Sequence, residues 1–454
     1  MKQPVHIIGG GLAGSEAAWQ LAERGHDVLL HEMRPARPTP AHKTDRLAEL
    51  VCSNTFKSTE LTNAHGLLKA EMRVLGSLIL DAADSARVPG GTALTVDREL
   101  FSRAVHDRLT THPRVTLVRD EVTTLPEVGI VATGPLTSEA LATAIADALG
   151  SRALAFYDAI APIVAGDSID ETIAFRASRY GKETMPNEDG GAYFNCPMSR
   201  EQYEAFLDAL AIADQATAHD FDAIPYFEGC MPIEEMARRG RDTLRFGPMK
   251  PVGLEDPRTG RRAYAVVQLR MEDRGGRMWN LVGFQTRVRY PEQQRVFRMI
   301  PGLENAEFLR YGSIHRNSYI NSPATLSPHL ALRDRATTLF AGQLTGVEGY
   351  TESSATGLLA GINLARLLDG EDVTLPPPTT MIGALYRYLR EADPRYFQPM
   401  NANFGLLDEL STPVRDKRVK REQLAARALA DLKTWADATG IQTTRHAEDH
   451  AHAR

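Results

Sequence analysis

The N-terminal segment VHIIGGGLAGSEAAWQLAERGHDVLLHE constrains the fold more than any other part of the chain. It begins with a short apolar run, Val5–Ile8, of the kind that forms a buried parallel strand. A glycine-rich turn of the form G-x-G-x-x-G follows, and residues 15–23 then carry apolar side chains on one helical face. A second apolar run, residues 27–31, ends at Glu32. This order of strand, turn, helix and strand predicts a βαβ unit that binds a dinucleotide.

Each part of the turn has its own physical role. Gly9 permits a tight turn, Gly11 lets the backbone approach a pyrophosphate, and Gly14 lets the helix pack closely on the strand. The helix N-terminus would face the phosphate charge, and Glu32 would accept hydrogen bonds from a ribose hydroxyl. A plain tight turn would leave Glu32 without an explanation. The predicted cofactor-binding residues in this segment are Gly9, Gly10, Gly11, Leu12, Ala13, Gly14 and Glu32.

Two later segments favour FAD as the dinucleotide. GIVATGP, residues 129–135, has the form of the strand with which flavoproteins of the two-dinucleotide-fold type return to their first domain. TLFAGQLTGVEGYTESSATGLLAGINLARLL, residues 338–368, predicts a strand, a glycine-rich loop and a helix lined with small residues. The N-terminus of that helix would stabilise a reduced flavin, although tight helix–sheet packing also selects Gly and Ala. The predicted cofactor contacts here are Gly134, Gly342, Glu352 and Ser353.

The separation of these segments predicts a discontinuous domain. A chain of 454 residues is too long for one ordinary domain. The expected fold class is α/β: an FAD-binding Rossmann-like domain of the two-dinucleotide-fold flavoprotein type, interrupted by an inserted α+β domain. We place the FAD-binding domain at residues 1–160 with 325–400. The inserted, substrate-facing domain is 161–324, and 401–454 forms a C-terminal helical segment.

Composition narrows the class of protein further. The N-terminus does not have the pattern of a signal peptide, and no apolar run is long enough for a membrane span. The three cysteines include no CxxC pair, so neither a disulfide framework nor a metal site is expected. We therefore expect a cytoplasmic protein with reduced thiols. The net charge of −6 does not indicate a nucleic-acid binder, but a local basic face is compatible with it.

Long blocks over nearly the whole chain carry a resemblance to a known family. They include HIIGGGLAGSEAAWQLAERG, ELVCSNTFKS, GGTALTVDRELFS, YFEGCMPIEEMARRG, LVGFQTRV and YGSIHRNSYINSP. With these blocks the sequence resembles the folate- and FAD-dependent tRNA (uracil-5-)-methyltransferase family. A related flavoprotein that helps to modify the wobble uridine of tRNA is longer, so chain length favours the methyltransferase. The tail from about Pro413 is less characteristic.

The resemblance implies the reaction and its partners. Methylenetetrahydrofolate would supply the carbon and NADH or NADPH the electrons, and reduced FAD would relay both to C5 of a uridine. That uridine would be position 54 in the T-loop of tRNA, and 5-methyluridine would be the product. The expected partner is tRNA, with no membrane and no metal, and protein partners stay unassigned.

This chemistry needs a reactive cysteine. A thiolate that adds to C6 of uracil makes C5 nucleophilic, and a base must later remove the C5 proton. In the family two positions are treated as catalytic, and they correspond to Cys52 and Cys230 here. We predict that Cys52 is the nucleophile and Cys230 its partner, an order that the sequence leaves open. Lys57 would favour the Cys52 thiolate if it lies close.

The other two thiols are distinguished by their surroundings. Cys230 lies just before a helix that Pro232 would initiate, where a helix N-terminus favours a thiolate. Cys196 lies in the apolar run YFNCPM, and we expect a structural role for it.

Two basic segments are candidates for an RNA-binding surface. Residues 238–250, with Arg258, Arg261 and Arg262 nearby, would bind phosphates or simply form a solvated sheet edge. Residues 415–422 would contact tRNA or cap a surface helix. Candidates for the folate contacts are Gln285, Thr286, Arg316, Asn317 and Tyr319.

Four alternative functions stay open at this point. The same chemistry could act on a ribosomal RNA uridine, or the chain could be the wobble-uridine flavoprotein that works with a GTPase. A redox switch or RNA chaperone that holds FAD for stability is a third class, and a generic FAD oxidoreductase without RNA is the fourth.

Overall fold

The computed structural model describes residues 3–39, 41–150, 154–182, 191–216 and 231–443. The first lobe is built on a five-stranded parallel sheet that joins the two ends of the chain. Because β1 lies at its centre, the glycine turn that follows β1 opens at the carboxyl edge of the sheet. The strand order is β16 (Thr338–Phe340), β7 (Gly129–Val131), β1 (Val5–Ile8), β2 (Val28–His31) and β6 (Val115–Val118).

Helices α1 (Leu12–Glu23) and α11 (Tyr350–Leu368) cross at very short range. A Cβ on Gly357 would lie 2.1 Å from the Ala13 carbonyl oxygen, and one on Gly361 would lie 2.8 Å from that of Ala17. The small residues of α11 therefore serve backbone-to-backbone packing at these two positions. The sequence allowed for such packing but placed it against a sheet, whereas the partner is a helix.

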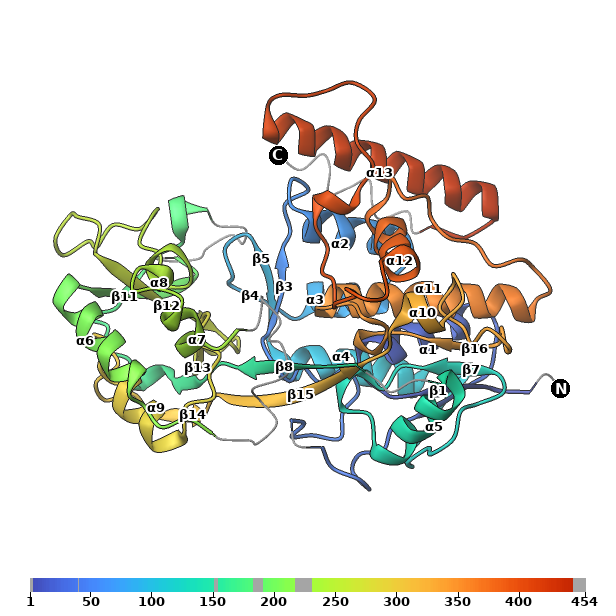
Figure 1. Cartoon of the computed structure of the whole chain (residues 1–454), viewed down its shortest axis with the longest axis horizontal. Helices are drawn as coiled ribbons and strands as arrows, with labels where there is room; N and C mark the ends of the chain where they lie inside the picture. The colour runs from blue at the N-terminus through green and yellow to red at the C-terminus, as the bar shows by residue number, and fades with distance from the viewer. Residues whose placement is uncertain (1–2, 40, 151–153, 183–190, 217–230, 444–454) are drawn as a thin grey trace.

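The second lobe is a six-stranded sheet in which every paired strand is antiparallel. Helices α6 (Arg200–Ala211), α7 (Ile233–Arg238), α8 (Thr243–Phe246) and α9 (Tyr290–Phe297) belong to it. A long two-stranded ribbon, β8 (Leu154–Ile160) with β15 (Ser313–Tyr319), runs between the two lobes (Figure 1). The strand order is β10 (Phe175–Arg176), β11 (Tyr193–Met198), β12 (Ala265–Met271), β13 (Met278–Leu281), β9 (Ile163–Ala165) and β14 (Phe308–Arg310).

A small third sheet lies beside the parallel sheet and carries the chain onward from Cys52. Its order is β3 (Thr55–Ser58), β5 (Ala93–Val96) and β4 (Arg87–Val88). The remaining α-helices of the described residues are α2 (Ala64–Val74), α3 (Leu78–Ser85), α4 (Arg98–Thr111), α5 (Glu139–Leu149), α10 (Ser322–Thr325), α12 (Met381–Glu391) and α13 (Lys417–Thr439).

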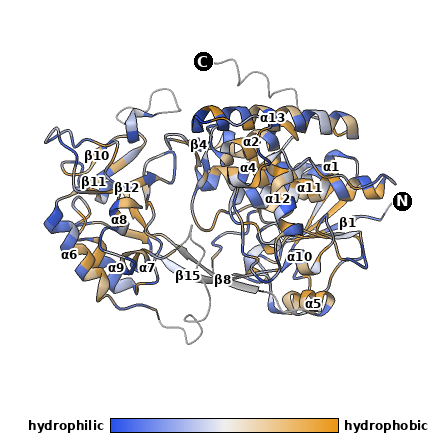
Figure 2. Cartoon of the chain, turned by 45° about the horizontal axis from the view of Figure 1, so that its top comes forward, coloured by the Kyte–Doolittle hydropathy of each residue, from blue (hydrophilic) through white to orange (hydrophobic). Residues whose placement is uncertain are grey.

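Two hydrophobic cores correspond to the two lobes. The first contains residues between Val5 and Ile145 and again between Tyr319 and Ile441, and the second contains Val88 and residues between Val164 and Ala306. The domain boundaries predicted above stay a prediction. The terminal helix α13 carries hydrophilic and hydrophobic residues (Figure 2), and its buried residues, such as Leu432, pack into the first core. Among the residues described, no helix has the length and apolarity that a membrane crossing requires.

Candidate active site

One cavity joins the segments that the sequence assigned to a dinucleotide. It encloses about 1050 Å³ of empty space, including its open mouth. The predicted residues that line it come from four separate parts of the chain: Gly9, Gly10, Gly11, Leu12, Ala13, Glu32, Gly134, Gly342 and Ser353. Gly14 and Glu352 are not among the lining residues.

The glycines of the turn serve two different purposes: close packing of the backbone, and open space for a ligand. Gly9 has φ +105°, a conformation that side chains disfavour, and a Cβ on Gly14 would lie 1.8 Å from the Gly9 carbonyl oxygen. A Cβ on Gly11, in contrast, would meet nothing within 4 Å. Gly14 therefore closes the helix onto the turn, while Gly11 leaves free space at the N-terminus of α1. That open space, on a wall of backbone at a helix N-terminus, fits a pyrophosphate.

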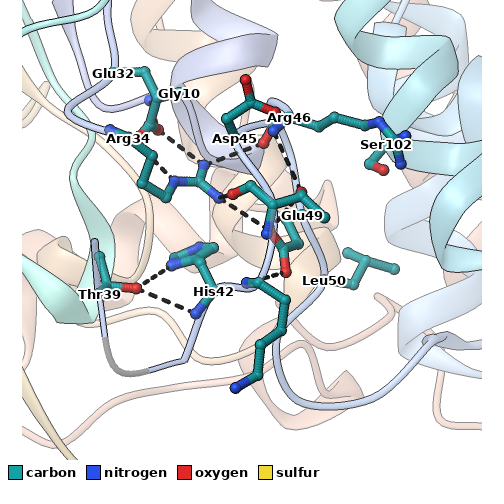
Figure 3. Close-up of polar contacts among 12 residues, drawn as sticks. Gly10, Glu32, Arg34, Thr39, His42, Asp45, Arg46, Glu49, Leu50 and Ser102 are labelled. Carbon is teal, nitrogen blue, oxygen red and sulfur yellow. Dashed lines mark hydrogen bonds and ion pairs between the residues drawn. The ribbon is translucent and has the colours of Figure 1, made fainter. Parts of the chain in front are cut away.

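Glu32 is held by a neighbour that the sequence did not single out. Arg34 forms a two-pronged ion pair with it, with N–O distances of 2.9 and 3.0 Å, and the N–H of Gly10 donates to the same carboxylate at 3.1 Å (Figure 3). Burial would raise the pKa of Glu32, but the hydrogen bonds and charge of Arg34 outweigh burial and lower it. The backbone N–H of Arg34 also donates to the Glu32 carboxylate, so each of its two oxygens accepts two hydrogen bonds. A ribose hydroxyl would have to share or replace one of these donors.

Arg34 in turn anchors the loop that covers this end of the cavity. Its guanidinium donates to the carbonyl oxygens of Thr44 and Arg46 at 3.0 and 3.2 Å and to the Glu49 carboxylate at 3.1 Å. Glu49 also accepts the N–H groups of Lys43 and Thr44. One buried arginine thus connects the end of β2 to the segment that leads to Cys52.

Glu352 turns away from the cavity. Its carboxylate accepts the N–H of Ala402 at 2.9 Å and lies 3.0 Å from His65 Nδ1. Burial would raise its pKa, but the His65 hydrogen bond and the Lys57 charge outweigh burial and lower the pKa to about 2. The structure thus gives Glu352 a place in the link between α11, α2 and the segment after α12. Its prediction as a cofactor contact has no support in this geometry.

We expect Glu352→Gln to weaken the fold by about 2 to 3 kcal/mol at pH 7. A carboxyl group whose pKa is lowered by folding stabilises the protein above its unfolded pKa. That contribution is lost as the pH falls from about 4.5 towards 2. Denaturant unfolding at several pH values measures it, with Glu422→Gln as a matched control at an exposed helical ion pair. Equal losses in both variants would contradict the assignment.

The loop that carries Cys52 lies against the same cavity. Its neighbours Val51 and Tyr350 line the cavity, and the Cys52 thiol is half-buried. The Tyr350 hydroxyl, from the first turn of α11, accepts the N–H groups of Cys52 and Ser53 at 2.9 and 3.1 Å. Arg98 of α4 donates to the Cys52 carbonyl oxygen at 3.0 Å. A single tyrosine therefore connects the thiol loop with the helix that faces the cavity.

Comparisons with known proteins identify the family. The family model described as Glucose inhibited division protein A matches residues 4–372. The methylenetetrahydrofolate--tRNA-(uracil-5-)-methyltransferase TrmFO of Geobacter sulfurreducens is 58% identical over 96% of this chain and 99% of its own length. The enzyme of the same name from Solibacter usitatus is 58% identical over 96% of this chain and its full length. The chain belongs to the TrmFO family. This confirms the resemblance read from the sequence blocks.

Solved structures show the fold. Two crystal forms of GidA from Aquifex aeolicus superpose with TM-scores of 0.69 and 0.68, covering 98% of this chain and 74% and 77% of theirs. Their identity of 16% limits the comparison to the fold. The predicted α/β flavoprotein fold class is confirmed.

Several residues around the thiol loop were missed by sequence reasoning. Asn54 is fully buried, and its side-chain amide donates to the carbonyl oxygens of Val96 and Met271 at 2.8 and 2.9 Å. It also accepts from Arg270 at 2.9 Å. The partners of this loop lie up to 298 positions away in the chain, so local patterns contained no signal for them.

The effect of Lys57 on the Cys52 thiolate stays a prediction. The Lys57 charge acts on Glu352 and on the buried Lys69. The charged groups whose ionisation responds to Cys52 are Arg98 and Arg310. Both arginines donate hydrogen bonds to backbone carbonyl oxygens of the thiol loop, and sequence reasoning missed them.

Of the two remaining cysteines, the structure describes Cys196 but not Cys230. Cys230 lies outside the described residues, although helix α7 begins at Ile233 directly after Pro232, close to the predicted start. Cys196 is buried in the second core, and burial raises its pKa. This placement agrees with the structural role expected for Cys196.

The candidate RNA surfaces are partly neutralised. Within residues 238–262, Arg238, Arg241, Arg245 and Arg258 all pair with carboxylates at 2.8 or 2.9 Å. The second basic segment forms the start of α13 instead of preceding it, and Arg418 and Lys420 pair with Glu422 and Glu409. RNA contact at either surface stays a prediction.

The folate candidates are only partly described. The Thr286 hydroxyl donates to the Glu234 carboxylate at 2.8 Å, and the Tyr319 hydroxyl donates to the Phe397 carbonyl oxygen at 3.3 Å, both in buried positions. The side chains of Arg316 and Asn317 lie outside the described residues. In the described part of the chain, no group of three or more His, Cys, Asp and Glu side chains is arranged to hold a metal ion.

Proposed function

We propose that this chain methylates C5 of the T-loop uridine at position 54 of tRNA through a Cys52 adduct. Folate-dependent methylation of a tRNA uracil follows from relatives of that name that are 53 to 58% identical over 95 to 97% of the chain. The position of the uridine, the identity of the reductant and the cysteine adduct go beyond what the names of these relatives imply. The observation that carries the adduct is the position of the half-buried Cys52 loop on the wall of the glycine-lined cavity.

In this proposal the Cys52 thiolate forms a bond to C6 of the uracil, and C5 then attacks an electrophilic methylene that methylenetetrahydrofolate supplies, with tetrahydrofolate released. A base removes the C5 proton, and elimination at C6 releases the thiol. We assign Cys230 the partner role in these steps. The adduct requires an accurately placed sulfur, and Tyr350 and Arg98 supply this by holding the backbone on both sides of the Cys52 peptide.

In this proposal FAD occupies the cavity, where the glycine turn would hold its pyrophosphate and Gly342 and Ser353 would provide further contacts. When reduced by NADH or NADPH, FAD supplies the two electrons that turn the transferred methylene into a methyl group. Glu32, ordered by Arg34, would hold the adenosine end.

The test is a reaction with mapped product. The purified yellow protein is incubated with methylenetetrahydrofolate, NADH or NADPH, and an unmodified tRNA transcript, and mass spectrometry locates the methyl group. We expect one methyl group, at the T-loop uridine. A transcript with cytidine at that position is the matched control and should stay unmethylated.

Other outcomes separate the alternatives. Methylation of ribosomal RNA alone would retain the chemistry and overturn the tRNA assignment. A product at the wobble uridine would favour the alternative that the chain is the wobble-uridine flavoprotein. FAD and RNA binding without product would favour a non-enzymatic protein.

A further inference from the structure

Among the described side chains around Cys52, positive charge exceeds negative charge. Three arginines converge on residues 50–54: Arg98, Arg270 and Arg310. Among the side chains described there, the carboxylate that pairs with them is Glu272, which is fully buried. One carboxylate cannot balance three guanidinium groups.

Two of these arginines have assigned partners. Arg98 pairs with Glu272 and donates to the carbonyl oxygens of Leu50 and Cys52 at 2.5 and 3.0 Å. Arg270 donates to the Asn54 side chain and lies 3.9 Å from Glu272. Both are therefore fixed parts of the support beneath the loop.

Arg310, at the end of β14, differs from them. It donates to the Val51 carbonyl oxygen at 2.5 Å, and the described side chains place no carboxylate within ion-pair distance of it. Burial and the nearby Arg98 charge lower its pKa. A half-buried cation without a counter-ion is costly. A guanidinium has five N–H donors, so most of the hydrogen-bonding capacity of Arg310 is left for a ligand.

We propose that Arg310 binds an oxyanion of a substrate beside Cys52. This inference rests on the proposed function and adds to it a residue that touches the substrate. A planar guanidinium matches the two oxygens of a phosphate or a carboxylate. Two substrates of the proposed reaction carry such groups: the RNA backbone has phosphates, and the folate tail has carboxylates.

FAD does not supply this oxyanion. Arg310 is not among the residues that line the dinucleotide cavity, whereas its backbone partner Val51 is. The pyrophosphate of FAD is expected at Gly11 and the N-terminus of α1, which line that cavity. Arg310 therefore faces the thiol loop from the side of the second lobe.

The first test is Arg310→Gln in the full-length holoprotein, with KM measured separately for tRNA and for methylenetetrahydrofolate. We expect about a tenfold rise in one KM, the size of a single charge-assisted hydrogen bond. If the ligand is an RNA phosphate, the tRNA KM rises and the slope of log affinity against log salt falls by about one unit. If it is a folate carboxylate, the folate KM rises and the tRNA salt slope stays unchanged.

Arg298→Gln is the matched control, because Arg298 is an exposed arginine that also donates to a single carbonyl oxygen, that of Ala306. It should leave both KM values unchanged. Unchanged KM values in a folded, FAD-loaded Arg310→Gln protein would overturn the proposal.

A second measurement uses the unmutated protein and requires neither turnover nor a stable variant. Phenylglyoxal modifies accessible arginines, and peptide mass spectrometry reports the extent at Arg310 and Arg298. We expect tRNA or methylenetetrahydrofolate, added separately, to protect Arg310 at least threefold more than Arg298. Protection of neither residue, or equal protection of both, would overturn the oxyanion site. Since this measures binding, its failure is distinct from absence of methylation by the same preparation, which would overturn the proposed function.

Discussion

Cys52→Ala is expected to lower methyl transfer by a factor of about 10⁴ or more while FAD stays bound. The reason is chemical, because no other group on the described part of the loop can form the bond to C6. The fold should tolerate the change: the loop is held through backbone atoms of residues 50–53 and through Asn54, and none of these contacts uses the sulfur. Trapping with 5-fluorouridine tRNA, followed by denaturing electrophoresis, measures adduct formation directly.

The other thiols provide the comparison. Cys196→Ala should retain activity and lose only packing in the second core. Cys230→Ala should lose turnover but still form the adduct if Cys230 is the partner. A stable adduct in Cys52→Ala that disappears in Cys230→Ala would reverse the order of the two roles.

Gly14→Ala and Gly11→Ala should have opposite consequences, although they lie in the same turn. A Cβ on Gly14 would lie 1.8 Å from a backbone oxygen, so the helix or the turn has to move. We expect a loss of more than about 4 kcal/mol in the free energy of unfolding. Gly11 has φ −76° and free space around the missing Cβ, so alanine is compatible with the fold. Its methyl group, however, would stand where a pyrophosphate approaches.

Gly11→Ala should therefore keep the melting temperature of the apoprotein and lower FAD affinity about tenfold or more. Thermal unfolding with and without added FAD separates the two effects, and flavin fluorescence gives the dissociation constant. An unfolded Gly11→Ala, or a stable Gly14→Ala with normal FAD affinity, would contradict the assignment of packing to Gly14 and access to Gly11.

Local sequence patterns were sufficient to predict the strands and helices at the nucleotide-binding end of this protein. The strand Val5–Ile8 lies where the apolar run predicted it, and α1 and β2 follow within a few residues of their expected bounds. A βαβ unit is a local structure, and a Cβ on Gly14 would collide with the carbonyl oxygen of Gly9 in the same turn. The helix at residues 350–368 was also anticipated, because its periodicity and glycine-rich start are local signals.

The partners of individual side chains could not be predicted in this way. Glu32 lines the cavity as expected of a ribose acceptor, but the sequence did not reveal that Arg34, two residues further on, donates to both of its oxygens. Glu352 was expected at the cofactor, but it turns to His65 and Ala402. In both cases the residue type was informative, whereas its direction depended on rotamers and neighbours fixed only by packing.

The sequence by itself determined the family and the fold class. These depend on long contiguous blocks, on the period of apolar residues and on glycines at fixed spacing. Tertiary structure alone decided what surrounds Cys52. Its backbone partners Arg98, Arg310 and Tyr350 lie 46, 259 and 298 positions from the residues they hold. Only chain folding brings such distant charges and hydroxyls within hydrogen-bond distance, because no pattern within one segment constrains them.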